Sequence, residues 1–272
     1  MNRGYVIPIG GAEEKIRNRQ ILRRFVELCG GDRARIAVIP TASQLAETGE
    51  NYTRVFEDLG ARVRSLPFEQ RADADRADWR DKLERANGVF FTGGNQLRLS
   101  TTLGGTAVAD LIRRRNREEG LHVAGTSAGA SFLSEHMIAG GEEGSTPRSG
   151  KVTLSPGLGV ARLAIIDQHF RQRDRLGRLL AAVAYNPRLI GIGLDEDTAA
   201  FIDPEEVLTV VGSGGITIVD PSEMEFSAMS SVEGDDPVCV IGNRLHVLTD
   251  GATYDILNRR ATPPKRNLSR SA

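Results

Sequence analysis

The sequence has few cysteines, almost no net charge and no long apolar run. Its two cysteines, Cys29 and Cys239, lie far apart in the chain and form neither a disulfide framework nor a spaced zinc motif. The 35 basic and 36 acidic residues leave a net charge of −1, which gives no overall attraction to nucleic acid or an anionic membrane. No segment resembles a signal peptide or approaches the ~18 continuous apolar residues of a membrane span. We therefore expect a reduced, cytoplasmic protein that binds neither nucleic acid nor membranes.

Short apolar runs, each followed by a turn, recur through the first half of the chain, and in three of them the turn is rich in glycine. Four such runs have the composition of buried strands: 4–11 (GYVIPIGG), 35–40 (RIAVIP), 87–95 (NGVFFTGGN) and 121–129 (LHVAGTSAG). Helical patterns lie between them, as in 14–31, which ends at a glycine pair suited to a C-cap. This alternation predicts an α/β fold with a mostly parallel, doubly wound sheet and helices on both faces. In such sheets the ligand site lies beyond the carboxyl ends of the strands, where these glycine turns fall.

The pattern changes after about residue 200 to shorter strands with alternating polarity. Residues 246–256 (HVLTDGATYDI) alternate around an Asp-Gly pair, which predicts a hairpin. No proline- or serine-rich linker separates this part, so we expect an antiparallel extension of one α/β domain over residues 1–260. The last residues, 261–272 (ATPPKRNLSRSA), are polar and basic and predict a mobile tail.

The segment 125–129 (GTSAG) fits the nucleophile-elbow pattern G-x-S-x-G, between a strand and a segment with helical composition. Its small residues leave room for Ser127 in a strained turn, with its hydroxyl near the first free N–H groups of the following helix. Such groups can stabilise a developing oxyanion. The same small residues would also suit close helix–sheet packing or a phosphate-binding turn, so the pentapeptide alone leaves both interpretations open.

A serine nucleophile needs a base, and the chain contains four histidines. His169 follows the strand-like run 163–167 (LAIID) and therefore lies at a strand's carboxyl end, where it could reach the serine. His122 falls inside a strand, His136 lies nine residues after the serine, and His246 is an alternating strand residue. A structural role for His169 remains open at this point.

The third member of a triad would be a carboxylate that orients the imidazole. Asp195, Glu196 and Asp197 follow an apolar run with two glycines, again at a predicted strand end. Their spacing does not choose among the three, and a solvated acidic turn is the alternative. The resulting chain order, Ser–His–acid, differs from the Ser–acid–His order of the α/β-hydrolases.

Four segments together resemble the cyanophycinases, within the family of serine peptidases that also contains the aspartyl dipeptidases. They are 91–96 (FTGGNQ), 126–131 (TSAGAS), 167–178 (DQHFRQRDRLGR) and 193–199 (GLDEDTA), and the second half of 167–178 is rich in arginine. The resemblance covers nearly the whole chain. It implies Ser127 as nucleophile, His169 as base and Glu196 as orienting acid. It also implies a fold like that of the class I glutamine amidotransferases (flavodoxin-like), and a homodimer.

Cyanophycin, the substrate implied by this resemblance, is a poly-aspartate with arginine on each β-carboxyl. The expected activity is a serine-type exopeptidase that releases β-Asp-Arg dipeptides through an acyl-enzyme. The resemblance carries six residues over as substrate-binding: Gln96, Asp167, Gln168, Arg173, Arg175 and Arg178. The alternative for the arginines is a solvated helix face. The N–H groups of Gly94 and Ala128 are our candidates for the oxyanion hole.

We expect no metal and no cofactor. The His and carboxylate residues show no helix-spaced ligand pattern, and 157–162 (GLGVAR) lacks the third glycine of a dinucleotide fingerprint. Two other functions stay open from the sequence. One is an aspartyl dipeptidase of the same family. The other is a non-catalytic α/β module whose glycine turns bind an anion.

Overall fold

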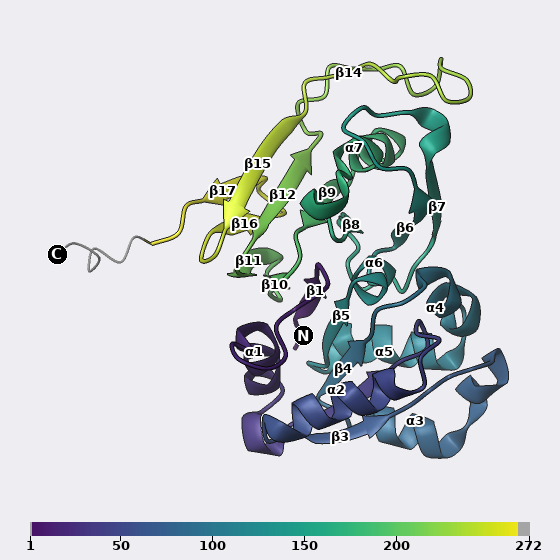
Figure 1. Cartoon of the computed structure of the whole chain (residues 1–272), viewed down its shortest axis with the longest axis vertical. Coiled ribbons are helices and arrows are strands. Elements are labelled where there is room, and N and C mark those ends of the chain that lie inside the picture. Colours follow the sequence, from purple (N-terminus) through teal and green to yellow (C-terminus); the bar gives the residue numbers. More distant parts are fainter. Residues whose placement is uncertain (1, 266–272) are drawn as a thin grey trace.

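The computed structural model describes residues 2–265, and its largest element is a nine-stranded sheet in the order β17-β16-β11-β10-β1-β5-β4-β2-β3 (Figure 1). Apart from the edge strand 62–65, its parallel half is buried on both faces, as continuous apolar strands require. That half contains β1 (Val6–Ile9), β5 (His122–Thr126), β4 (Gly88–Phe91), β2 (Arg35–Ile39) and β3 (Arg62–Ser65). The antiparallel half contains β10 (Thr198–Ile202), β11 (Val207–Gly212), β16 (Thr253–Asp255) and β17 (Arg260–Thr262).

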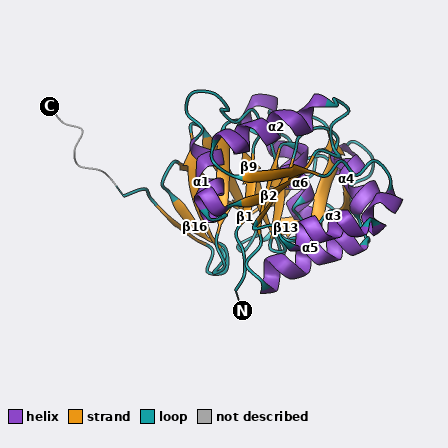
Figure 2. Cartoon of the chain, turned by 90° about the horizontal axis from the view of Figure 1, so that it is seen from below, coloured by secondary structure: helices purple, strands orange, loops and turns teal. Residues whose placement is uncertain are grey.

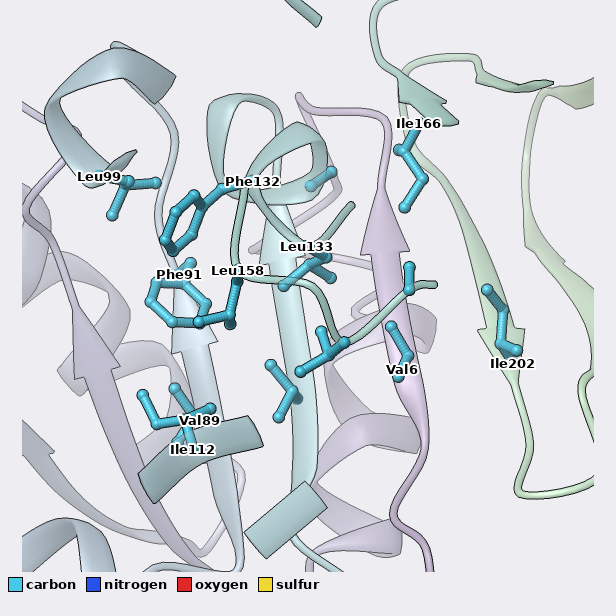
Figure 3. Packing of buried hydrophobic residues seen from close by; sticks show 14 of the residues in the cluster. Val6, Val89, Phe91, Leu99, Ile112, Phe132, Leu133, Leu158, Ile166 and Ile202 are labelled. Atoms are coloured by element: carbon cyan, nitrogen blue, oxygen red, sulfur yellow. The ribbon is translucent and has the colours of Figure 1, made fainter. Parts of the chain in front are cut away.

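Helices cover both faces of this sheet, because alternate strand residues point to opposite sides. Figure 2 shows α1 and α2 on one face and α3 and α5 on the other. Phe25 and Phe56 pack with one set of strand residues, whereas Phe132 and Ile112 pack with the other, which includes Phe91 (Figure 3). The bounds are α1 (Gln20–Leu28), α2 (Glu47–Asp58), α3 (Ala77–Glu84), α4 (Gln96–Leu103), α5 (Ala107–Glu118) and α6 (Ala128–Phe132).

The helix predicted within 14–31 is shorter than its pattern. It begins only at Gln20, because the Glu14 carboxylate accepts hydrogen bonds from the N–H groups of Ile16 and Arg17 and holds this segment in a turn. Its end is as predicted: Gly30 follows the last helical turn with φ 108°, a conformation that glycine adopts without strain.

A second sheet of four strands, in the order β15-β12-β9-β8, packs beside the first. It consists of β15 (Arg244–Thr249), β12 (Gly215–Asp220), β9 (Ile190–Leu194) and β8 (Ala164–Asp167), and helix α7 (Leu176–Tyr185) covers it. Two short ribbons complete the described part: β6 (His136–Gly141) with β7 (Val152–Pro156), and β13 (Phe226–Ser227) with β14 (Val240–Ile241). No helix within residues 2–265 is long and apolar enough to cross a membrane.

The predicted fold class is confirmed: a doubly wound α/β sheet with an antiparallel extension. The division into two sheets was not predicted, since buried apolar strands give the same pattern in either sheet. β10 pairs with β1 and occupies the edge of the parallel half that β8 and β9 would otherwise extend.

The hairpin predicted at 246–256 is wrong. β15 pairs with β12 and β16 pairs with β11, so the turn joins two different sheets. Asp250 and Gly251 are bound to β11 instead: the Asp250 carboxylate accepts from Gly212 N–H, and Gly251 N–H donates to the carbonyl of Val210. β17 includes residues 261 and 262 of the predicted tail, whereas 266–272 lie outside the described residues.

Candidate active site

Ser127 occupies the turn between β5 and α6 in a strained conformation, with φ 52° and ψ −116°. The neighbouring glycines are required by close backbone contacts. A Cβ at Gly125 would lie closer than 3.0 Å to the carbonyl oxygen of Gly129, and one at Gly129 equally close to that of Phe91. The predicted strained turn is therefore present, and the small residues of GTSAG are what allow it.

A continuous hydrogen-bonded chain connects Ser127, His169 and Glu196. Ser127 Oγ lies 2.9 Å from His169 Nε2, and His169 Nδ1 lies 2.6 Å from Glu196 Oε1. His169 lies two residues after the end of β8 at Asp167, and Glu196 lies in the turn between β9 and β10. The hydroxyl thus comes from the nine-stranded sheet, and the imidazole and carboxylate come from ends of strands in the four-stranded sheet.

The structure separates the three adjacent carboxylates that the sequence could not. Asp195 accepts hydrogen bonds from the N–H groups of Arg171 and Gly215, and Asp197 accepts from Glu14 N–H and from the hydroxyl of Ser213. Both are therefore engaged in holding loops. Of the three, Glu196 is the carboxylate that contacts the imidazole, and its side chain is 38% exposed.

Within residues 2–265, His169 is the histidine that hydrogen-bonds to Ser127, and the other three have different surroundings. His122 Nδ1 accepts a hydrogen bond from Tyr5 N–H, and burial lowers the pKa of its imidazole. His136 is exposed at the start of β6. His246 lies in β15 opposite Ile218, at an edge of the four-stranded sheet.

Two backbone turns flank the serine hydroxyl. Gly93 approaches it so closely that a Cβ there would lie 3.3 Å from Ser127 Cβ, and Gly94 has φ 143°. Within residues 2–265, the N–H of Gly94 donates to no protein acceptor. Ala128 is the first residue of α6, so its N–H has no acceptor inside the helix. Both groups have the unsatisfied donor that an oxyanion hole needs, and that role stays a prediction.

Arg175 and Arg178 are buried near the turn that carries His169, with exposed fractions of 7% and 6%. The guanidinium of Arg178 forms two hydrogen bonds with the carboxylate of Asp167, one of them 2.7 Å long from Nε to Oδ2. Arg175 donates to the carbonyl of Gln168 at 2.6 Å, and burial lowers its pKa to about 10. The alternative of a solvated helix face is therefore wrong for these two residues, whereas Arg173 is exposed in a short 3₁₀ turn.

Of the two predicted glutamines, Gln168 contacts Ser127 and Gln96 contacts β6. The Gln168 side-chain oxygen is 3.5 Å from Ser127 Oγ. Gln96, at the start of α4, donates to the carbonyls of Ile138 and Ala139 in β6. Arg178 also lines a polar cavity of about 300 Å³, together with Glu142, Glu143, Gly144, Ser145, Thr146, Arg148, Lys151 and Asp174.

Gly11 is a site residue that the sequence analysis missed. It has φ 101°, and a Cβ there would lie 2.5 Å from Cε1 and Nε2 of the His169 ring. The backbone after β1 thus forms one wall of the imidazole's position. The glycine pair at the end of β1 was the available signal, because it matched the glycine turns at the other strand ends.

The fold and the site define an α/β protein in which a hydroxyl, an imidazole and a carboxylate are hydrogen-bonded in series at the carboxyl ends of the strands. The chain belongs to Peptidase family S51, whose model matches residues 6–210. This confirms the family resemblance found in the sequence, and the protein is a peptidase.

Two relatives extend the match. The chain is 43% identical to the cyanophycinase of Trichormus variabilis over 266 residues, covering 97% of this chain and 89% of the relative. It is 39% identical to the cyanophycinase of Geminocystis herdmanii over 264 residues, 96% of each chain. Both alignments span nearly the entire sequence and therefore include the segments 91–96, 126–131, 167–178 and 193–199.

Solved structures support the fold alone. A peptidase from an acI-B1 Actinobacterium superimposes with a TM-score of 0.70 at 22% identity, covering 93% of this chain and 97% of that one. A putative peptidase E protein from Listeria monocytogenes superimposes with a TM-score of 0.55 at 18% identity, covering 78% and 99%.

Proposed function

We propose that the protein is a serine peptidase that degrades cyanophycin, releasing β-Asp-Arg dipeptides from the polymer. The observation that carries this proposal is the hydrogen-bonded chain Ser127–His169–Glu196 in a chain 43% identical to a cyanophycinase. The three side chains stand in the order that acyl transfer needs: a nucleophile within hydrogen-bond reach of a base, and the base held by a third group.

In the proposed mechanism, His169 accepts the proton of Ser127 as the hydroxyl oxygen attacks an aspartyl backbone carbonyl. Glu196 accepts from His169 Nδ1, which leaves Nε2 free to take the proton and stabilises the imidazolium that forms. The N–H groups of Gly94 and Ala128 would stabilise the tetrahedral oxyanion. His169 then donates its proton to the leaving amine, and water hydrolyses the acyl-enzyme by the reverse sequence.

Among the six residues carried over as substrate-binding, we propose two kinds of contribution. Gln96, Gln168 and Arg173 would contact the substrate, since Gln168 reaches Ser127 Oγ and Arg173 is exposed next to the base. The buried residues Asp167, Arg175 and Arg178 would act by fixing the turn that carries Gln168 and His169. The Asp167 carboxylate and the carbonyl of Gly141 hold the guanidinium of Arg178, and the carbonyl of Gln168 holds that of Arg175.

Incubation with cyanophycin and with Asp-X dipeptides, followed by mass analysis of the products, tests the proposal. Release of β-Asp-Arg from the polymer alone supports a cyanophycinase, whereas cleavage of the dipeptides alone supports an aspartyl dipeptidase. The matched control is Ser127→Ala, which removes one oxygen at an unchanged turn and should abolish both activities. Binding of the polymer without cleavage by the wild type would favour a non-catalytic module and contradict the proposal.

We also propose that the enzyme is a cytoplasmic homodimer that cleaves from a chain end. The family resemblance supports the dimer and the direction of cleavage. The cytoplasmic location is supported by Cys29 and Cys239, which form no disulfide. Light scattering of the purified protein tests the dimer. The time course of polymer length tests the direction of cleavage: an exopeptidase leaves long polymer and dipeptides together at early times, whereas an endopeptidase shortens all chains first.

A further inference from the structure

Glu13 is a buried carboxylate that the proposed mechanism does not use. It follows β1 in the segment GGAEEK, and its side chain is 1% exposed. Oε2 accepts a hydrogen bond of 2.6 Å from the hydroxyl of Thr126, and Oε1 accepts one from the hydroxyl of Tyr52. The Lys15 ammonium lies 3.2 Å from Oε1. Isolated buried carboxylates are costly, and these three donors compensate this one.

The partner Thr126 is the residue immediately before Ser127. It is itself buried, at 2% exposure, and ends β5 where the backbone enters the strained serine turn. A strained φ persists only when the surrounding structure fixes it from several directions. The hydrogen bond that Thr126 donates to Glu13 fixes the side chain of Thr126. The backbone is fixed at the next residue, where Ser127 N–H donates to the carbonyl of Ile9 at 3.0 Å.

The same loop also holds the two turns of the four-stranded sheet. The carbonyl of Gly10 accepts from His169 N–H at 2.8 Å, and that of Gly11 accepts from Asp197 N–H at 2.8 Å. Residues 9–13 therefore contact each of the turns that carry Ser127, His169 and Glu196. Glu13 is the side chain of this loop that anchors it to the elbow and, through Tyr52, to helix α2.

We propose that Glu13 is a positioning residue for hydrolysis, acting through Thr126 and the 9–13 loop to keep Ser127 Oγ in line with His169 Nε2. This inference rests on the proposed function of Ser127 as nucleophile. The Tyr52 hydroxyl keeps its proton and donates to Glu13 throughout the neutral pH range. The reason is that burial, and then the negative charge of Glu13, raise the pKa of the phenol well above 10.0. A misplacement of about 1 Å in such a site can lower the rate by about 100-fold.

The test compares Glu13→Gln and Thr126→Val with the neighbouring Glu14→Gln. Glu13→Gln removes the negative charge, and Thr126→Val removes the hydroxyl at nearly constant shape. Both should lower kcat on cyanophycin by about 10- to 100-fold with little change in KM, since the substrate contacts stay in place. Glu14→Gln should leave both constants unchanged, and Thr126→Ser should keep most of the activity that Thr126→Val loses.

A fluorophosphonate probe that labels nucleophilic serines separates positioning from folding. The labelled amount counts correctly folded sites, and the labelling rate reports the reactivity of Ser127 independently of the substrate. A positioning role predicts a slower labelling rate at an unchanged final amount. The opposite result is a loss of folded protein in Glu13→Gln and Thr126→Val, with kcat per labelled site and labelling rate within about twofold of wild type. Glu13 would then be merely structural, and the inference would be overturned.

Failure of the proposed function gives a different result. Wild-type protein that neither hydrolyses cyanophycin nor reacts with the probe would contradict the nucleophile itself. Wild type that labels but leaves cyanophycin intact would contradict the substrate and leave the labelling comparison among the Glu13, Thr126 and Glu14 variants as the deciding measurement.

Discussion

The two sheets hold their parts of the site by different physical means. In the nine-stranded sheet, Ser127 is placed by backbone contact, because Gly125 and Gly129 let α6 approach within a distance that no side chain would allow. In the four-stranded sheet, a buried ion pair of Asp167 with Arg178 lies at the strand end that precedes His169. The strand end that carries Ser127 therefore combines close backbone packing with the buried Glu13 carboxylate, whereas the strand end that carries His169 combines an interior ion pair with the space left by Gly11.

The largest expected effect comes from weakening the hydrogen-bonded series Ser127–His169–Glu196, which joins the two sheets. Glu196→Gln leaves the shape of the turn but removes the negative charge that orients His169. We expect kcat on cyanophycin to fall by about 10⁴-fold, as in Ser–His–Asp enzymes that lose this charge. Thermal stability should change little, because the side chain is 38% exposed. A loss below tenfold in steady-state assays would show that Glu196 does not serve as the orienting acid.

Removing one charge of the buried pair tests the four-stranded sheet. Asp167→Asn leaves Arg178 without its counter-charge at 4% side-chain exposure. Breaking a buried ion pair by removing one partner costs about 3–5 kcal/mol, which urea unfolding would detect. The matched control is Glu50→Gln, whose partner Arg54 is 67% exposed and which should leave the unfolding midpoint nearly unchanged. Equal midpoints for the two variants would refute the distinction between the sheets.

Adding one carbon tests the nine-stranded sheet. Gly129→Ala forces a methyl group against the backbone of Phe91, which must shift. We expect a loss of about 1–3 kcal/mol in the free energy of unfolding, as for other overpacked sites, and a large loss of activity as the Ser127 turn moves. Gly140→Ala is the control, since a Cβ at Gly140 meets no atom within 4 Å. Wild-type activity in Gly129→Ala would mean that close packing is not what sets the serine.

The smallest effect concerns alkaline pH. Burial raises the pKa of the Tyr52 phenol well above 10.0, so the folded protein keeps a proton that the unfolded chain releases near pH 10. The stabilisation is complete below that pH and declines as the pH rises further, by at most about 1.4 kcal/mol per pH unit. Tyr52→Phe should flatten this decline in unfolding curves from pH 9 to 11, whereas Tyr185→Phe, at 46% exposure, should not. Parallel curves for wild type and Tyr52→Phe would contradict the shift.

The sequence was sufficient to locate the turns of the site but not the sheets that carry them. A glycine-rich turn after an apolar run identified the strand end of Ser127, and the apolar run 163–167 identified that of His169, because strand and turn chemistry are local. Whether two strands share a sheet depends on partners distant in sequence. The Asp250-Gly251 pair shows this: its local pattern is typical of a hairpin, yet β11 and β12 supply the actual partners of the flanking strands.

The interior arginines were the second limit of the sequence. Arg175 and Arg178 match a solvated helix face by periodicity, and their burial depends on Asp167 pointing inward from the end of β8. The choice of Glu196 among three acids likewise needed the family resemblance, because all three follow the same strand. Contacts that occupy Asp195 and Asp197 come from segments that are remote in the chain.

The chain crosses between the two sheets four times, once through the long segment 127–163 and three times through the short connections 195–197, 213–214 and 250–252. Each short connection has two or three residues and spans at most about 10 Å when fully extended. Three connections of this length limit how far the two sheets can move apart. The hydrogen bond between Ser127 Oγ and His169 Nε2, which joins the two sheets, therefore lies in a framework with little freedom to separate its parts.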